Sequence, residues 1–283
     1  MTLKPLVKWA GGKTDLLPII EEKVNSVWQK NSRFFDVFAG GASVAFNFVE
    51  KFQKMYINDA NKELVNLYSV VRDHPDLLMK FLDDHLKNHS KEYFYSVRNW
   101  DRTDRFLMLD PVEKAARTLY LNKTCYNGLY RVNSKGEFNV PIGSRKPKSL
   151  YDKNNLLNVS HFLRSASITN LDYYEVIQEA QPGDIVYLDP PYDKVSDHYF
   201  IAYNGKQFDE FDQKRLALDV KKLTRKNVYV IFSNSATKRI LELYKDYIDE
   251  KSYVSVLKRI SSKGSGRKYF DEILGDNFKH IRI

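Results

Sequence analysis

Short hydrophobic runs alternate with amphipathic stretches in the first sixty residues. Apolar positions have helical spacing over residues 15–29 and again over 43–52. Each of these stretches is followed by a hydrophobic run typical of a strand, at 34–38 and at 55–57. The order helix, strand, helix, strand is typical of an α/β fold.

The same alternation returns in the last hundred residues. Hydrophobic runs at 185–188 and 228–232 lie on either side of a stretch with helical periodicity at 211–223. A further strand is predicted at 167–171. Both ends of the chain are therefore predicted to contribute to one sheet.

Residues 61–151 show a different pattern, because β-rich runs disappear and helical periods dominate. One apolar helix face comprises Val112, Ala115, Ala116, Leu119 and Tyr120. This region ends in a stretch rich in Gly, Pro and Lys, at 127–148, which is too polar for a core and too aromatic for a plain linker.

These patterns predict two structural units. Residues 1–61 and 152–283 are expected to form the sheet domain, and residues 62–151 an inserted, mainly helical domain.

The composition narrows the class of protein. With 45 Lys and Arg against 36 Asp and Glu, the net charge of +9 suits a polyanionic partner without naming one. Cys125 has no second cysteine with which to form a disulfide, and the six scattered histidines show no metal-ligand spacing, so no metal is expected. No apolar run approaches the ~20 residues that a membrane span needs, and the N-terminus lacks a secretion signal. These features predict a cytoplasmic protein that contacts no membrane.

The sequence Asp189-Pro190-Pro191-Tyr192 directly follows a hydrophobic strand, where α/β folds place their ligand crevice. Proline lacks an N–H and restricts φ, so such a turn can present a carbonyl outward beside the carboxylate. Two fixed acceptors can bind both hydrogens of an exocyclic amine and stabilise the positive charge of its alkylation. The aromatic Tyr192 can stack on a base. Taken alone, the four residues are equally consistent with a turn that ends a strand.

Two further motifs favour a nucleoside ligand. Phe38-Ala39-Gly40-Gly41-Ala42-Ser43 lies where a strand passes into a helix, so its glycines allow close backbone approach. Asn58-Asp59 follows the next strand, where an acidic residue commonly accepts ribose hydroxyls.

A third motif, Lys8-Trp9-Ala10-Gly11-Gly12-Lys13, precedes the first helix. Its indole and ammonium could face an adenosine and a carboxylate, although a partly buried tryptophan and a solvated lysine explain the same residues. The motif lacks the spacing of a P-loop.

In this order, the four motifs resemble the Dam family of adenine-N6 DNA methyltransferases, the D12 class that includes enzymes methylating GATC, over nearly the whole chain. The resemblance implies a Rossmann-like, S-adenosylmethionine-dependent sheet with helices on both faces, and an inserted DNA-recognition domain with a β-hairpin. It implies catalysis by Asp189, Pro190, Pro191 and Tyr192. It implies cofactor contacts at Trp9, Lys13, Phe38, Asp59, Asp172 and Asp189.

The basic stretch at 123–148 is the candidate DNA contact. It carries six basic residues against one acid, Glu137, although a solvated basic loop has the same composition. The resemblance implies that Arg131 reads a guanine, that Asn127 and Leu129 touch neighbouring bases, and that Pro141 packs on a thymine methyl. It further implies that Tyr126 fills the stack vacated by a flipped adenine, and that Lys8 contacts DNA.

A second basic stretch surrounds residues 258–268 and is predicted either to contact phosphate or to form a flexible surface hairpin. Because adenine N6 is hydrogen-bonded inside a duplex, transfer predicts base flipping. The amine is itself the nucleophile, so Cys125 is expected to pack rather than to react.

Several alternatives stay open at this point. Cytosine N4 or adenine in RNA offers a similar amine, and a catalytically silent nucleic-acid-binding module would carry the same basic loops. An NAD-dependent oxidoreductase shares the acidic residue after the second strand but requires a G-x-G-x-x-G that is absent here. The resemblance implies a bacterial or phage-encoded enzyme, acting alone or beside a separate cognate restriction endonuclease.

Overall fold

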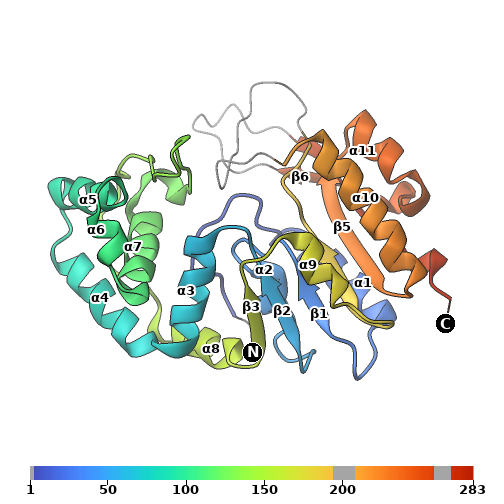
Figure 1. Ribbon diagram of the computed structural model, residues 1–283, viewed down its shortest axis with the longest axis horizontal. Helices are drawn as coiled ribbons and strands as arrows, with labels where there is room; N and C mark the ends of the chain where they lie inside the picture. Colours follow the sequence, from blue (N-terminus) through green and yellow to red (C-terminus); the bar gives the residue numbers. More distant parts are fainter. Residues whose placement is uncertain (1–2, 194–207, 258–268, 283) are drawn as a thin grey trace.

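Seven strands form one sheet in the order β3-β2-β1-β4-β5-β7-β6 (Figure 1). The computed structural model describes residues 3–193, 208–257 and 269–282. Strands β3, β2, β1, β4 and β5 are parallel, and β7 is antiparallel to both β5 and β6. The strands are β1 (Phe34–Asp36), β2 (Met55–Asn58), β3 (Ala166–Thr169), β4 (Ile185–Leu188), β5 (Tyr229–Ser235), β6 (Tyr253–Leu257) and β7 (Tyr269–Asp276). The prediction that both ends of the chain build one α/β sheet is confirmed.

Alternate residues of the central strands point to opposite faces of the sheet. In β4, Ile185 and Tyr187 join one hydrophobic cluster, while Val186 and Leu188 join the other. All four side chains are buried, which explains why the strand is a continuous hydrophobic run rather than an alternating one.

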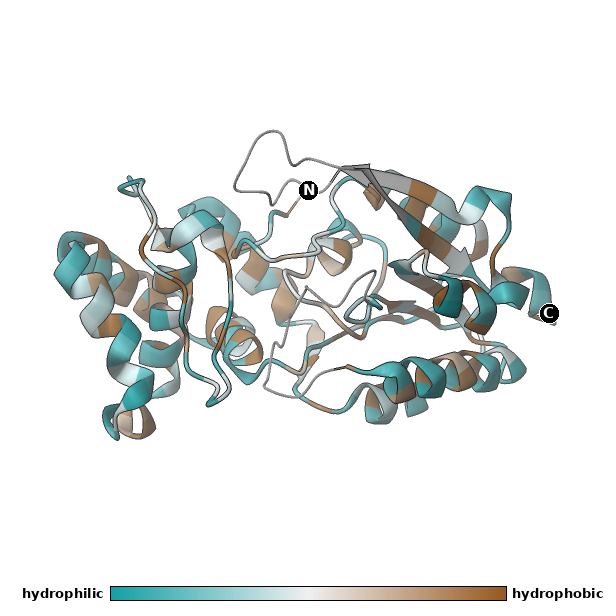
Figure 2. Ribbon diagram, turned by 90° about the horizontal axis from the view of Figure 1, so that it is seen from above, coloured by the Kyte–Doolittle hydropathy of each residue, from teal (hydrophilic) through white to brown (hydrophobic). Residues whose placement is uncertain are grey.

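Helices cover both faces. The first face packs against α1 (Leu17–Val27), α2 (Ser43–Asn47) and α8 (Lys153–Leu163), and the second against α9 (Tyr173–Gln178), α10 (Glu210–Arg225) and α11 (Lys238–Leu243). Viewed from above, the helices of the structure carry both hydrophobic and hydrophilic residues, as amphipathic helices do (Figure 2).

The predicted helix at 43–52 is wrong in length, because α2 ends at Asn47. Phe48 leaves helical geometry, and its ring packs 5.2 Å from that of Phe34, while Phe52 packs 5.1 Å from the same ring. Both buried aromatics thus meet one partner on β1, and this tertiary packing overrides the local helical pattern.

Five of the six α-helices between β2 and β3 lie together at one end of the sheet (Figure 1). They are α3 (Lys62–Asp73), α4 (Pro75–Lys87), α5 (Lys91–Arg98), α6 (Arg105–Met108) and α7 (Pro111–Thr124). The predicted face of α7 is buried. One hydrophobic cluster runs from the sheet through α3 into α7, so this helical segment shares its core with the sheet.

Residues 125–142 fold back on themselves after α7. Isolated antiparallel bridges join Cys125 to Ile142 and Val132 to Phe138, and Gly136 turns the tip with a φ of +79°. The predicted hairpin is therefore present directly after α7, as two isolated bridges rather than two regular strands.

Candidate active site

Asp189 lies at the carboxyl end of β4 and contacts two side chains from distant parts of the chain. Lys13 Nζ lies 2.5 Å from its Oδ2, and Ser233 Oγ of β5 donates to its Oδ1 at 2.8 Å. Because Lys13 is almost fully buried, this ion pair is shielded from solvent. The first and last sequence motifs therefore meet at one carboxylate.

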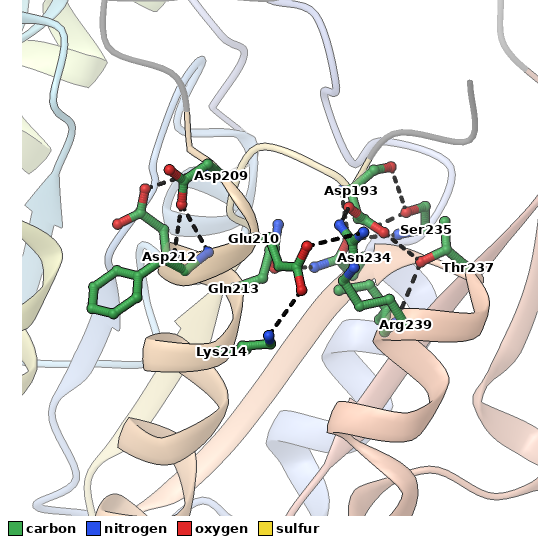
Figure 3. Close-up of polar contacts among 12 residues, drawn as sticks. Asp193, Asp209, Glu210, Asp212, Gln213, Lys214, Asn234, Ser235, Thr237 and Arg239 are labelled. Atoms are coloured by element: carbon green, nitrogen blue, oxygen red, sulfur yellow. Dashed lines mark hydrogen bonds and ion pairs between the residues drawn. The ribbon is translucent and has the colours of Figure 1, made fainter. Parts of the chain in front are cut away.

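The turn after Asp189 is held by neighbouring elements. Gln213 Nε2 donates to the Pro191 carbonyl at 2.9 Å and accepts through Oε1 from Asn234 Nδ2 at 3.1 Å. Asp193 accepts from Thr237 and Arg239, as Figure 3 shows. Asp193, two residues after Pro191, is thus bound to the start of α11. These contacts restrict the turn that contains both prolines.

The Tyr192 hydroxyl is bound by a side chain of β7. This hydroxyl donates to Glu272 Oε2 at 2.9 Å, and Lys13 Nζ lies 5.1 Å from the ring centroid. Burial, together with the charges of Asp189 and Glu272, raises the pKa of Tyr192 well above its ordinary value. The ring therefore stays a neutral aromatic surface.

The glycine turn after β1 approaches Trp9 closely. Gly40 has a φ of +50°, and a Cβ placed on it would lie 2.7 Å from Trp9 Cδ1. Tyr68 donates to the Gly40 carbonyl, so the turn is held from the helical segment as well. Only glycine satisfies both the backbone conformation and the space at this position.

Asp59 joins this turn to the end of β2. Its Oδ2 accepts from the Gly40 amide at 2.8 Å, and its Oδ1 accepts from the Asn61 amide at 2.8 Å. Burial raises the pKa of Asp59, while these two amides oppose the shift. A carboxylate oxygen has two lone pairs, so each keeps room for another donor.

Asp36, which the sequence analysis did not single out, lies buried at the end of β1. Burial raises its pKa to about 7, the Ala45 amide opposes this shift, and the charges of Asp189 and Asp59 add to it. Its Oδ2 accepts from that amide at 3.1 Å. A charged residue inside the hydrophobic run at 34–38 was the available signal.

Asp36→Asn is expected to change how stability depends on pH. The pKa is higher in the folded chain, about 7, than the ordinary 3.8, so its contribution is full below pH 4 and lost as the pH rises to 7. The variant does not titrate there. Its free energy of unfolding relative to wild type should rise by roughly 2–4 kcal/mol between pH 4 and pH 8.

Urea unfolding at a series of pH values measures this difference. Glu22→Gln, which removes an exposed carboxylate from α1, is the matched control. A wild-type minus variant difference that stays constant with pH would show that Asp36 does not titrate in this window.

Two predicted cofactor residues lie nearer the second face of the sheet. The Phe38 ring centroid lies 5.6 Å from that of Tyr173 and 5.9 Å from that of Phe208. Asp172 is exposed, caps α9 through the Tyr174 amide at 2.9 Å, and pairs with Arg215 at 3.3 Å. Asp172 is therefore already engaged in local structure, and its predicted cofactor contact stays a prediction.

The predicted DNA-contacting residues gather on one turn and its partner strand. Asn122 binds the Lys8 amide and carbonyl, both at 2.9 Å, and the Gly128 carbonyl at 3.0 Å, so Lys8 lies against this turn. The Tyr126 amide donates to the Pro141 carbonyl at 2.9 Å, and both side chains are exposed. Asn127, with a φ of 55°, is exposed and Leu129 is half-buried.

Arg131 is exposed and held in place by its partner strand. Its Nε donates to Asn139 Oδ1 at 2.7 Å, and its carbonyl accepts from the Asn139 amide at 3.0 Å. Asn139 therefore fixes the Nε of Arg131 against the hairpin, while the side chain as a whole is exposed to solvent.

Cys125 packs as expected, because it is buried where α7 ends and burial raises its pKa to about 12. The second basic stretch, 258–268, lies outside the described residues. Among residues 3–193, 208–257 and 269–282, no three acidic, His or Cys side chains form a metal-binding group. Over the same residues, no helix has the length and hydrophobicity to cross a membrane.

Sequence reasoning also missed Ser233 and Glu272, which hold Asp189 and Tyr192. Neither belongs to a recognisable motif, because each reaches the site only through sheet pairing between β5, β7 and β4.

Known proteins resemble this chain along most of its length. The family model for D12 class N6 adenine-specific DNA methyltransferases matches residues 9–260. The Type II methyltransferase M1.LlaDCHI of Lactococcus lactis subsp. cremoris is 38% identical over 281 residues, covering 98% of this chain and 96% of that protein.

Two relatives from other sources are also similar to this chain over most of its length. The Type II methyltransferase M.CviBI of Paramecium bursaria Chlorella virus NC1A is 34% identical over 261 residues, or 89% of this chain and 91% of that protein. The DNA adenine methylase of Salmonella typhi is 31% identical over 274 residues, or 96% and 94%. The carboxylate turn after β4 and the glycine turn after β1 thus occur in a chain that belongs to the D12 class of N6 adenine-specific DNA methyltransferases.

Proposed function

We propose that this adenine-specific DNA methyltransferase uses S-adenosylmethionine to methylate N6 of an adenine that is turned out of the duplex, within GATC. The observation that carries the proposal is Asp189, which is fixed between Lys13 and Ser233 at the end of β4. The family requires a methyl donor and DNA. The identity of the donor, the flipped base and the target sequence are the proposed parts.

The electrostatics of the site suit a cationic cofactor. The charges of Asp189, Asp59 and Lys13 all act on Asp36, so acidic groups gather where β1, β2 and β4 end. S-adenosylmethionine, when bound, supplies an electrophilic methyl on a positively charged sulfonium. Carboxylates stabilise such a charge in a site shielded from water.

Shape supports the same cofactor. The glycine turn brings backbone close to Trp9, and Asp59 keeps lone pairs for ribose hydroxyls. In this proposal Trp9, Phe38 and Asp59 hold the nucleoside, and Lys13 binds the carboxylate of the amino acid part. The exposed Asp172 would contribute only at the rim.

The adenine amine needs two acceptors in defined places. Asp189 supplies one, and its ion pair with Lys13 holds the carboxylate in place. The Pro191 carbonyl is bound by Gln213, so the Pro190 carbonyl is the backbone group proposed as the second acceptor. Together they orient the nitrogen lone pair and stabilise the positive charge that develops on N6. Tyr192 offers its ring for stacking.

Methylation of DNA with labelled S-adenosylmethionine tests the proposal. Digestion to nucleosides should release label in N6-methyladenine, and sequencing of methylated positions should return GATC. Label in N4-methylcytosine, or equal transfer to RNA, would contradict the chemistry. Methylation of adenine at another site would keep the chemistry and reject the target. A cognate restriction endonuclease encoded beside the gene would assign the enzyme to restriction and modification.

Arg131→Ala is expected to relax target choice. Because Arg131 is proposed to read guanine with two hydrogen bonds, its loss should cost ~1–3 kcal/mol of discrimination at one base pair. The measurement is kcat/KM on the preferred site and on sites with one base pair replaced. Arg145→Ala, which removes an exposed arginine from the same basic stretch, is the control. An unchanged preference in Arg131→Ala would reject the reading role.

A further inference from the structure

We propose that Asp101 and Arg102 are positioning residues for target discrimination, because they hold the hairpin of residues 125–142 in the register that aims Arg131. Both lie on the short 3-10 helix η1 (Asn99–Arg102), which follows α5. The inference rests on the proposed reading role of the hairpin, and it adds residues that need not touch DNA.

Phe138 presents its backbone to η1. The Val132–Phe138 bridge is flanked by hydrogen bonds from Asn133 to Glu137 and from Asn139 to Arg131, at 2.9 and 3.0 Å. Phe138 therefore belongs to a pair that exchanges no bond, and its own N–H and C=O point away from the partner strand. Such groups are left unpaired on the edge of a two-stranded ribbon.

Asp101 and Arg102 satisfy both of these groups. The Phe138 amide donates to Asp101 Oδ2 at 2.7 Å, and Arg102 Nη2 donates to the Phe138 carbonyl at 2.7 Å. Arg102 Nη1 also donates to Asp101 Oδ1 at 2.9 Å. The two side chains thus replace the third strand that the hairpin lacks.

Asp101 and Arg102 together form a clamp on the Phe138 backbone, and this clamp is anchored in the helical segment. The nearly buried guanidinium of Arg117, on α7, lies 2.7 Å from Asp101 Oδ2 and donates to the carbonyls of Val97 and Arg98 at 3.0 and 2.7 Å. Arg102 donates to the Arg98 carbonyl as well, at 3.0 Å. A partly buried, charge-assisted network of this kind is stronger than an exposed ion pair.

Displacement of Phe138 would reach Arg131 through one residue. Asn139 follows Phe138 directly, and it binds Arg131 through both its backbone amide and its side chain. Since bidentate reading of a base depends on a defined guanidinium position, loosening Phe138 should cost discrimination more than it costs turnover.

Arg102→Ala is the main test, because it removes the bond to the Phe138 carbonyl and leaves Asp101 paired with Arg117. We expect a loss of about tenfold in the ratio of kcat/KM between GATC and sites with one base pair replaced, with kcat on GATC within about threefold of wild type. Arg105→Ala, which removes an exposed arginine from the neighbouring α6, should leave the ratio unchanged. Asp101→Asn, which keeps the size of the side chain, should lower the ratio in the same direction.

A double variant separates positioning from general destabilisation. If Arg102 acts through Arg131, Arg102→Ala combined with Arg131→Ala should discriminate no worse than Arg131→Ala alone. Additive losses, or an equal fall in kcat/KM on every substrate, would overturn the proposal.

Hydrogen exchange tests the clamp without reference to DNA reading. Amides of residues 130–140 should exchange faster in Arg102→Ala than in Arg105→Ala. Unchanged exchange would overturn the clamp itself. If Arg131→Ala leaves discrimination intact while exchange in Arg102→Ala is faster, then the reading role of the hairpin fails and the clamp stands.

Discussion

Asp189→Ala is expected to lower kcat for methyl transfer about 10²–10³-fold, measured at saturating S-adenosylmethionine and DNA. The carboxylate is proposed to act as a fixed acceptor where charge develops, and removal of one such preorganised group costs about 10²–10³ in rate. Lys13, with 6% of its side chain exposed, also loses its carboxylate partner in this variant, so thermal unfolding should show a less stable protein. Single-turnover transfer with labelled cofactor measures the effect.

Two further variants make this result specific. Asp189→Asn keeps the shape and one acceptor oxygen, so its defect isolates the charge. Ser233→Ala removes only the hydroxyl that holds Oδ1 at 2.8 Å and should cost about tenfold. Thermal unfolding checks that each variant is folded. Methyl transfer by Asp189→Ala at the wild-type rate would contradict the proposed mechanism.

Asp59→Ala is expected to weaken S-adenosylmethionine binding about 10–100-fold with a smaller change in kcat. The proposed hydrogen bond from a ribose hydroxyl to the carboxylate is worth ~1.5–3 kcal/mol, and the Gly40 amide loses its acceptor at the same time. Isothermal titration calorimetry gives Kd, and it needs no DNA.

Asp59→Asn separates the two causes, since its amide oxygen can still accept from the Gly40 amide. It should recover part of the affinity. Asp73→Ala, which removes an exposed carboxylate from α3, serves as the control. An Asp59→Ala protein with wild-type Kd would exclude Asp59 from the cofactor site.

The hydrophobic pattern predicted the five parallel strands, helped by the burial of the central ones on both faces, but it did not predict β6 and β7. The run at 185–188 is continuous since Val186 and Tyr187 each meet a different cluster, so its strand identity needs no tertiary information. The helix at 43–52 failed for the opposite reason. Phe48 and Phe52 fit a helical pattern locally, but both pack on Phe34, which comes from another element.

The candidate site divides in a similar way. Asp189 and Asp59 could be found from sequence because each ends a predicted strand, and parallel strands end at the same edge of a sheet. Asp172 also follows a predicted strand, and the structure shows it exposed and capping α9, a local role that its position after a strand did not predict.

The sequence by itself determined the α/β class, the five parallel strands, the motifs that mark the reaction family and the basic stretch at 123–148, because these depend on periodicity, composition and short spacings. Only the tertiary structure decided which partners complete them: Lys13 and Ser233 on Asp189, Glu272 on Tyr192, and Asp101 on Phe138. Each of these contacts joins residues that are 37 or more positions apart, and no local pattern marks the pairing. Hydrogen bonds and ion pairs act over a few ångströms in space, whereas sequence spacing carries information only within one element.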